Sequence, residues 1–139
     1  MKLITKFSPK LIAPCGMNCA VCRGYLTYTH NIPRGKGGPR CIGCRPRKKL
    51  CAFLKGQCVL IRENKIQFCY QCQKFPCRRL LVLDQRYRTK YHTSFVSNLK
   101  TIKKIGLSKW IKSQEKKWRC QNCGGVVCVH DRKCYDCGN

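Results

Sequence analysis

Two pairs of cysteines near the C-terminus have the spacing of a metal site. Each pair has a two-residue gap and a glycine directly after it: Cys120-Gln-Asn-Cys123-Gly124 and Cys134-Tyr-Asp-Cys137-Gly138. A two-residue gap lets both thiolates of a pair bind one ion, and the glycine permits the tight turn that points backbone N–H groups at sulfur. The pairs predict a short zinc ribbon with a closed tetrahedral site, which is structural and not catalytic. Cys128 and His130 lie between the pairs; either could replace one ligand, although we expect both to be bystanders.

Ten further cysteines lie between residues 15 and 77, and chain order does not fix which of them meet in space. Their spacing favours one ion at Cys41, Cys44, Cys51 and Cys58, and a second one drawn from Cys15, Cys19, Cys22, Cys69, Cys72 and Cys77. His30 is a further candidate ligand, although a surface role is more usual for a lone histidine. Zinc is the more common metal, so we expect two to three zinc ions in the protein. An iron–sulfur cluster also takes four thiolates and remains an alternative for the ten N-terminal cysteines.

The first residues argue for a reducing compartment. Met1 to Pro14 contain three lysines that interrupt any apolar run long enough for a signal peptide, and no stretch approaches the length of a membrane span. We therefore expect a cytoplasmic protein, in which clustered cysteines bind metal and do not form disulfides.

Basic side chains far outnumber acidic ones. The 139 residues include 30 Lys and Arg against 5 Asp and Glu, which gives a formal net charge of +25. Each zinc ion held by four thiolates removes two positive charges, so three such sites would leave about +19 of that total. A charge of this size attracts polyanions without sequence specificity.

The elements that position these groups form three segments. We predict a small, metal-stapled α+β protein with an irregular Cys-rich module over residues 1–77, a basic helical segment over residues 78–118 and the ribbon over residues 119–139. The middle segment has apolar residues at helical spacing. We expect Pro76 in the first turn of one helix, Ser94 and Gly106 at the two ends of a second, and Ser108 as the cap of a third. The pattern around Val126–Val129 is typical of a strand.

Candidate phosphate contacts come from two loops and from these helices. The loops contribute Arg34, Lys36, Arg40, Arg45, Arg47, Lys48 and Lys49, and the helices contribute Arg78, Arg79, Arg86, Arg88, Lys103, Lys104, Lys112 and Lys116. Residues 78–119 hold thirteen Lys and Arg but only Asp84 and Glu115, whereas an ordinary solvated helix would mix the two signs.

The order of motifs resembles a known family. The segments Ala13-Pro14-Cys15-Gly16-Met17-Asn18-Cys19, Cys41-Ile42-Gly43-Cys44, Phe68-Cys69-Tyr70-Gln71-Cys72 and Phe75-Pro76-Cys77 are similar to the prokaryotic domain-of-unknown-function 3795 family. In archaeal members the similarity continues through Arg86-Tyr87-Arg88, Asn98-Leu99 and Trp118-Arg119-Cys120 to the ribbon with His130. The resemblance implies metal binding and an archaeal source, and it implies no activity. This chain departs from the family in being so uniformly basic.

These features together favour a structural RNA-binding zinc protein, most concretely a small ribosomal or ribosome-associated protein that binds rRNA. The cations are spread from Lys2 to Lys133, which suits burial among RNA helices better than reading one DNA groove. We expect neighbouring ribosomal proteins as further partners, and neither a membrane nor a small-molecule substrate.

Two alternatives stay open: a DNA-binding or transcription-associated zinc protein, and an iron–sulfur redox or metal-transfer protein. The first lacks Cys2His2 spacing and a helix-turn-helix. We do not expect an enzyme, because five carboxylates offer little for acid–base chemistry and no phosphate-binding glycine motif is present.

Overall fold

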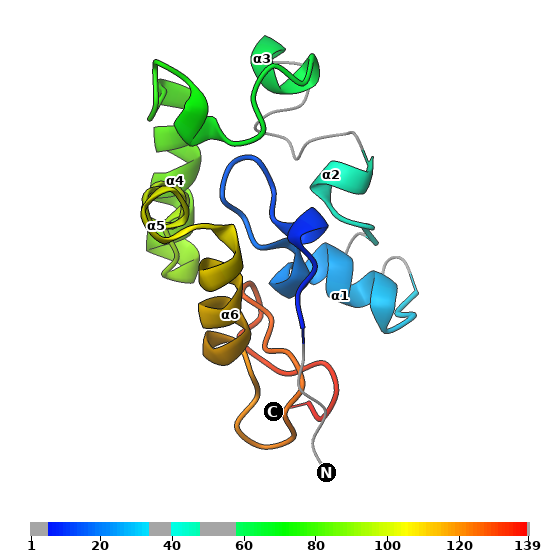
Figure 1. The fold of residues 1–139 in the computed structure, drawn as a ribbon. Helices are drawn as coiled ribbons and strands as arrows, with labels where there is room; N and C mark the ends of the chain where they lie inside the picture. The colour runs from blue at the N-terminus through cyan, green and yellow to red at the C-terminus, as the bar shows by residue number, and fades with distance from the viewer. Residues whose placement is uncertain (1–5, 34–39, 48–57, 139) are drawn as a thin grey trace.

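A computed structural model describes residues 6–33, 40–47 and 58–138, and this part of the chain is mostly helical (Figure 1). The α-helices are α1 (Arg23–Thr29), α2 (Cys44–Arg47), α3 (Val59–Arg62), α4 (Arg78–Tyr91), α5 (Phe95–Ile105) and α6 (Leu107–Lys117), and the short 3-10 helices are η1 (Pro9–Leu11), η2 (Cys19–Val21) and η3 (Cys69–Gln71). Within the described ranges β-structure is limited to three isolated bridges, which join Ile12 to Asn18, Arg119 to Val126, and Val127 to Cys134. The expected strand around Val126–Val129 is therefore reduced to two single bridges, and the β part of the predicted fold class is not seen in these residues.

The three helices of the basic segment form as predicted, with two differences at their starts. Ser94 caps α5, since its hydroxyl accepts a hydrogen bond from the backbone N–H of Ser97, and Gly106 ends that helix. The prediction that Ser108 caps α6 is wrong, because the Gly106 carbonyl already accepts from the Trp110 N–H and α6 begins at Leu107. Pro76 lies outside α4, whose N-cap is the extended residue Cys77.

A single hydrophobic core joins the N-terminal residues to these helices. Ile12, Leu80 and Leu99 are fully buried in it, together with Phe95, Ile102 and other apolar side chains. Gly16 lies where the loop before η2 passes over α5, and a Cβ there would be 2.8 Å from the Phe95 carbonyl oxygen and 2.9 Å from Leu99 Cγ. With a φ of +91°, this position needs glycine for both reasons.

The C-terminal residues pack against both other segments, beside α1 and α6 in Figure 1. The Val129 N–H donates to the Val21 carbonyl at 2.9 Å, and the Arg23 guanidinium pairs with Asp131 at 2.7 Å. In the same way, the Phe7 N–H donates to the Glu115 carboxylate at 2.6 Å. The three segments therefore share one core. No helix in the described residues is long and apolar enough to cross a membrane.

Asp84 is a buried charge that fixes the corner between α4 and α5. Its side chain is 5% exposed, and it accepts hydrogen bonds from the Ser94 hydroxyl, the Val96 N–H and the Arg88 guanidinium at 2.8 to 2.9 Å. Burial by itself would raise the pKa of this carboxyl, but the three donors outweigh burial and hold the pKa below its usual range.

Replacing Asp84 should therefore destabilise the fold. We expect Asp84→Ala to lower the free energy of unfolding by about 3 kcal/mol, because it leaves the Ser94 and Val96 donors without their charged acceptor. Because the native pKa is lowered, the contribution is present at neutral pH and should fade as the pH falls below about 4. Urea unfolding at pH 7 and at lower pH measures both effects. Gln85→Ala, at the exposed neighbour, should change stability by less than about 0.5 kcal/mol; equal losses in both variants would contradict this role.

Candidate metal centre

The four predicted ribbon thiols converge on one point. The Sγ atoms of Cys120, Cys123, Cys134 and Cys137 all lie within 4.8 Å of one another. Cys120 Sγ is 3.7 Å from Cys137 Sγ, and Cys123 Sγ is 3.5 Å from Cys134 Sγ. A tetrahedral zinc ion with Zn–S bonds of about 2.3 Å requires sulfur separations of roughly 3.8 Å. The four thiols therefore fit a single tetrahedral metal ion.

Two matching turns present these thiols. The Gly124 N–H donates to the Cys120 carbonyl at 2.9 Å, and the Gly138 N–H donates to the Cys134 carbonyl at 2.8 Å. Both glycines have a φ of +82°, which accounts for the glycine after each pair. The Gly125 N–H also donates to Cys123 Sγ at 3.3 Å, so backbone donors supply partial positive charge to a thiolate.

The crowding of the thiols couples metal binding to proton release. The Gly125 N–H lowers the pKa of Cys123, but contacts with the neighbouring thiols, together with burial, raise it to about 12. Four sulfurs this close cannot all lose their protons at neutral pH unless a cation neutralises them. Metal binding should therefore expel protons, and metal affinity should rise with pH.

Cys128 and His130 lie outside the converging group. Cys128 is fully buried, and its sulfur accepts from the Asp131 N–H at 3.5 Å. His130 joins the segments: Nδ1 accepts from the Arg23 N–H at 3.2 Å, and Nε2 contacts the Tyr87 hydroxyl at 2.8 Å. Burial, followed by the charge of Arg23, lowers the pKa of His130, so the neutral ring is favoured.

His30 also has protein partners at both ring nitrogens. Nε2 lies 3.0 Å from the Asp136 carboxylate, and Nδ1 lies 2.9 Å from the Leu26 carbonyl oxygen. Its place in the structure is a contact between α1 and the C-terminal residues, which supports neither predicted N-terminal metal set.

Four of the N-terminal cysteines lie around one cavity. Cys58, Cys69, Cys72 and Cys77 all line it, whereas Cys41 and Cys44 do not. Burial, together with the charges of Cys58, Cys77 and Cys72, raises the pKa of the Cys69 thiol to about 12. Cys51 lies outside the described residues. In the described part of the chain, the ribbon thiols are the only group whose ligand atoms all converge within 4.8 Å.

Cys15, Cys19 and Cys44 are buried near Arg45, as is Cys69 from the cavity, and their thiolate forms would raise the pKa of its guanidinium against the larger effect of burial. Cys22 and Cys41 lie near the start of α1, where the Cys41 N–H donates to the Gly24 carbonyl at 2.8 Å. These five thiols and the group around Cys58 account for nine of the ten N-terminal cysteines.

Arg45 has a structural role that its sequence context did not indicate. Its guanidinium donates to the Ile12 carbonyl and the Gln67 carbonyl, both at 2.6 Å, and stacks on the Phe68 ring at 4.7 Å. Burial lowers the pKa of this group. The sequence showed only a basic loop, and no local signal distinguishes an arginine that holds two segments together from one that binds phosphate.

The other candidate phosphate contacts vary in exposure. Arg40 is partly buried against the Tyr28 ring, and Arg88 pairs with Asp84. The remaining helical candidates are exposed, namely Arg78, Arg79, Arg86, Lys103, Lys104, Lys112 and Lys116. Arg34, Lys36, Lys48 and Lys49 lie outside the described residues, as does the side chain of Arg47.

Substitution at single cysteines should separate ligands from bystanders. We expect Cys123→Ser to lose one metal ion per chain, because the four-thiol site would lose a ligand, and Cys128→Ser to keep the full metal content. Elemental analysis of the purified variants measures this directly. A loss of metal in the Cys128 variant alone would show that Cys128 is the ligand.

Comparison with known proteins gives one match. A family model described as "Protein of unknown function (DUF3795)" matches residues 11–82, which is just over half of the chain. No curated protein and no solved structure matches this chain. The matched range contains the ten N-terminal cysteines and ends in α4, before the ribbon. By this match the chain belongs to the DUF3795 family of proteins of unknown function.

Proposed function

We propose that this protein is a structural RNA-binding zinc protein, ribosomal or ribosome-associated, that binds rRNA. The observation that carries the proposal is the position of the acidic side chains. Each of the five carboxylates contacts a donor within the protein: Glu63 with Lys65, Asp84 with Arg88, Glu115 with the Phe7 N–H, Asp131 with Arg23, and Asp136 with His30. Internal contacts thus occupy the acidic groups, and five carboxylates can compensate only a small part of the charge of 30 basic side chains.

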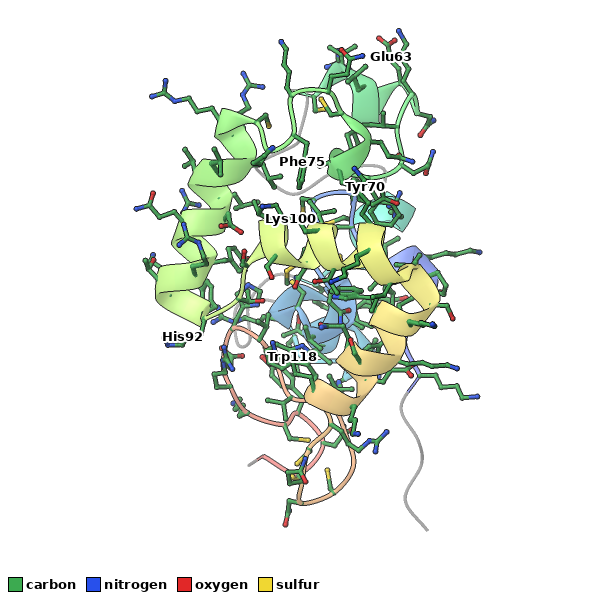
Figure 2. All side chains as sticks on the ribbon, turned by 60° about the vertical axis from the view of Figure 1, so that its left-hand side comes forward. Glu63, Tyr70, Phe75, His92, Lys100 and Trp118 are labelled. Atoms are coloured by element: carbon green, nitrogen blue, oxygen red, sulfur yellow. The ribbon has the colours of Figure 1, made fainter. Side chains whose placement is uncertain are left out.

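The exposed faces of α4, α5 and α6 carry many of these basic side chains. Side chains ending in nitrogen extend outward from these helices in Figure 2. The exposed ones are Arg78, Arg79, Arg86, Lys90, Lys100, Lys103, Lys104, Lys109, Lys112, Lys116 and Lys117. Cations on three successive helices suit several phosphate strands of a folded RNA better than one groove of a duplex.

Zinc at the four ribbon thiols would stabilise the fold, and RNA would bind the basic surface. The sulfur separations near 3.6 Å suit zinc, and a site closed by four thiolates leaves no position for a substrate. Because all five carboxylates have donors, none is positioned as a free general base, so we propose no enzymatic activity. Neighbouring ribosomal proteins are proposed as further contacts, and neither a membrane nor a small-molecule substrate is part of the proposal.

The salt dependence of RNA binding tests the helical face. Changing Lys103, Lys104, Lys112 and Lys116 together to glutamine should reduce the slope of log K against log salt concentration by about three units. Each lost phosphate contact lowers the magnitude of this slope by about 0.7 to 0.9. Fluorescence anisotropy with a structured rRNA fragment, at several salt concentrations, measures the slope.

A variant with the same charge change provides the control. Exposed lysines that are not part of these helices, namely Lys6, Lys10, Lys65 and Lys133, are changed to glutamine. The proposal expects the helical variant to lose more of the slope than this control. Equal slopes would mean that α5 and α6 are not the contact face, and tighter binding of duplex DNA than of RNA would favour the DNA-binding alternative.

A further inference from the structure

A second group of four thiols surrounds a cavity at the other end of the molecule from the ribbon. The cavity has a volume of about 400 Å³ and lies between α3, η3 and the start of α4. Cys58, Cys69, Cys72 and Cys77 all line it. Figure 2 shows Phe75, another lining residue, on the segment that leads into α4.

The two thiol groups differ in how closely the sulfurs approach. The ribbon sulfurs lie at distances that suit one ion, whereas no three of the four thiols around the cavity converge within 4.8 Å, although all four are described. One zinc ion would require sulfur separations of roughly 3.8 Å. An iron–sulfur cluster also takes four thiolates, but it places several metal ions and sulfides between them, so its ligands lie around a larger volume.

The walls of the cavity are mostly apolar. Val59, Leu60, Ile66, Phe75 and Leu80 contribute to the lining; Leu80 is fully buried, whereas Val59 at the mouth is 46% exposed. Cys72 Sγ accepts from the Lys74 N–H at 3.4 Å, a contact of the kind that stabilises cluster thiolates.

Positive charge lies on the same walls. A cluster with four thiolates is a net anion, and the cations of Lys74, Arg78 and Arg79 lie in the lining. Arg78 and Arg79 are the first residues of α4, whose N-terminal end adds the positive end of the helix dipole, and Cys77 is its N-cap. The wide spacing of the four thiols, the apolar side chains and the positive charge all favour an anionic iron–sulfur cluster in this cavity.

We propose that Cys58, Cys69, Cys72 and Cys77 bind a four-iron, four-sulfide cluster. The site is separate from the ribbon and does not depend on RNA binding. It replaces the predicted single-ion set in which Cys58 joined Cys41, Cys44 and Cys51, because the fold brings Cys58 to the later cysteines.

Cluster transfer to the full chain tests the proposal. The purified protein is incubated without oxygen with a preformed four-iron, four-sulfide cluster that carries four small thiolates. In this exchange each cysteine thiol passes its proton to a departing thiolate and takes its place on iron, so no electrons are transferred. We expect about four iron and four sulfide per chain, with broad visible absorbance. Retention of zinc alone, or of no metal, at these thiols would overturn the proposal.

Two matched variants assign the cluster to the cavity. Cys72→Ser should lose most of the iron and sulfide and keep the ribbon metal, whereas Cys137→Ser should lose the ribbon metal and keep the iron. A cluster retained in full by the Cys72 variant would contradict the assignment. Alkylation of the wild-type protein needs no variant: the loaded form should protect Cys58, Cys69, Cys72 and Cys77, and equal labelling with and without cluster would also overturn it.

Discussion

This protein has thirty basic side chains but only five carboxylates, and in the fold each carboxylate contacts a basic side chain or a backbone N–H of the same chain. Asp84 holds the corner between α4 and α5, Glu115 holds the N-terminal residues, and Asp131 holds α1 against the C-terminal segment. Four of the five acidic groups thus connect parts of the chain that are apart in the sequence, and Glu63 pairs with its neighbour Lys65. Five carboxylates cannot balance thirty basic side chains, and the mutual repulsion of the excess cations opposes folding unless a polyanion compensates it.

A small shared core opposes that repulsion, and a metal ion at the ribbon thiols would add to its effect. The core extends from Phe7 to Val129, and the ribbon thiols close the C-terminal turns around one point. A chain of this size with so many charges cannot rely on apolar burial alone, which is why small domains of this kind use metals. His130 shows how closely the parts depend on one another, since it contacts the backbone of Arg23 on α1 and the hydroxyl of Tyr87 on α4.

Local patterns predicted the local structure. Ser94 and Gly106 mark the ends of α5 because capping depends on a few neighbouring residues, and the ribbon quartet follows from two short turns. Features that depend on contacts between residues far apart in the sequence could not be predicted from local patterns. Cys58 lines the same cavity as Cys69, Cys72 and Cys77, and Arg45 bonds both Ile12 and Gln67, although these residues are apart in the sequence. Ser108 does not cap α6, because Gly106 occupies the N-cap position of this helix.

We propose that ribosomal RNA compensates the excess positive charge of this protein. Sedimentation of extracts from cells that make the protein tests this claim most directly, with the chain followed through a sucrose gradient. The protein should sediment with ribosomal subunits at moderate salt, and ribonuclease or high salt should release it, because phosphate contacts weaken as the salt concentration rises. Recovery only in the soluble fractions at the top of the gradient, at every salt concentration, would contradict the account.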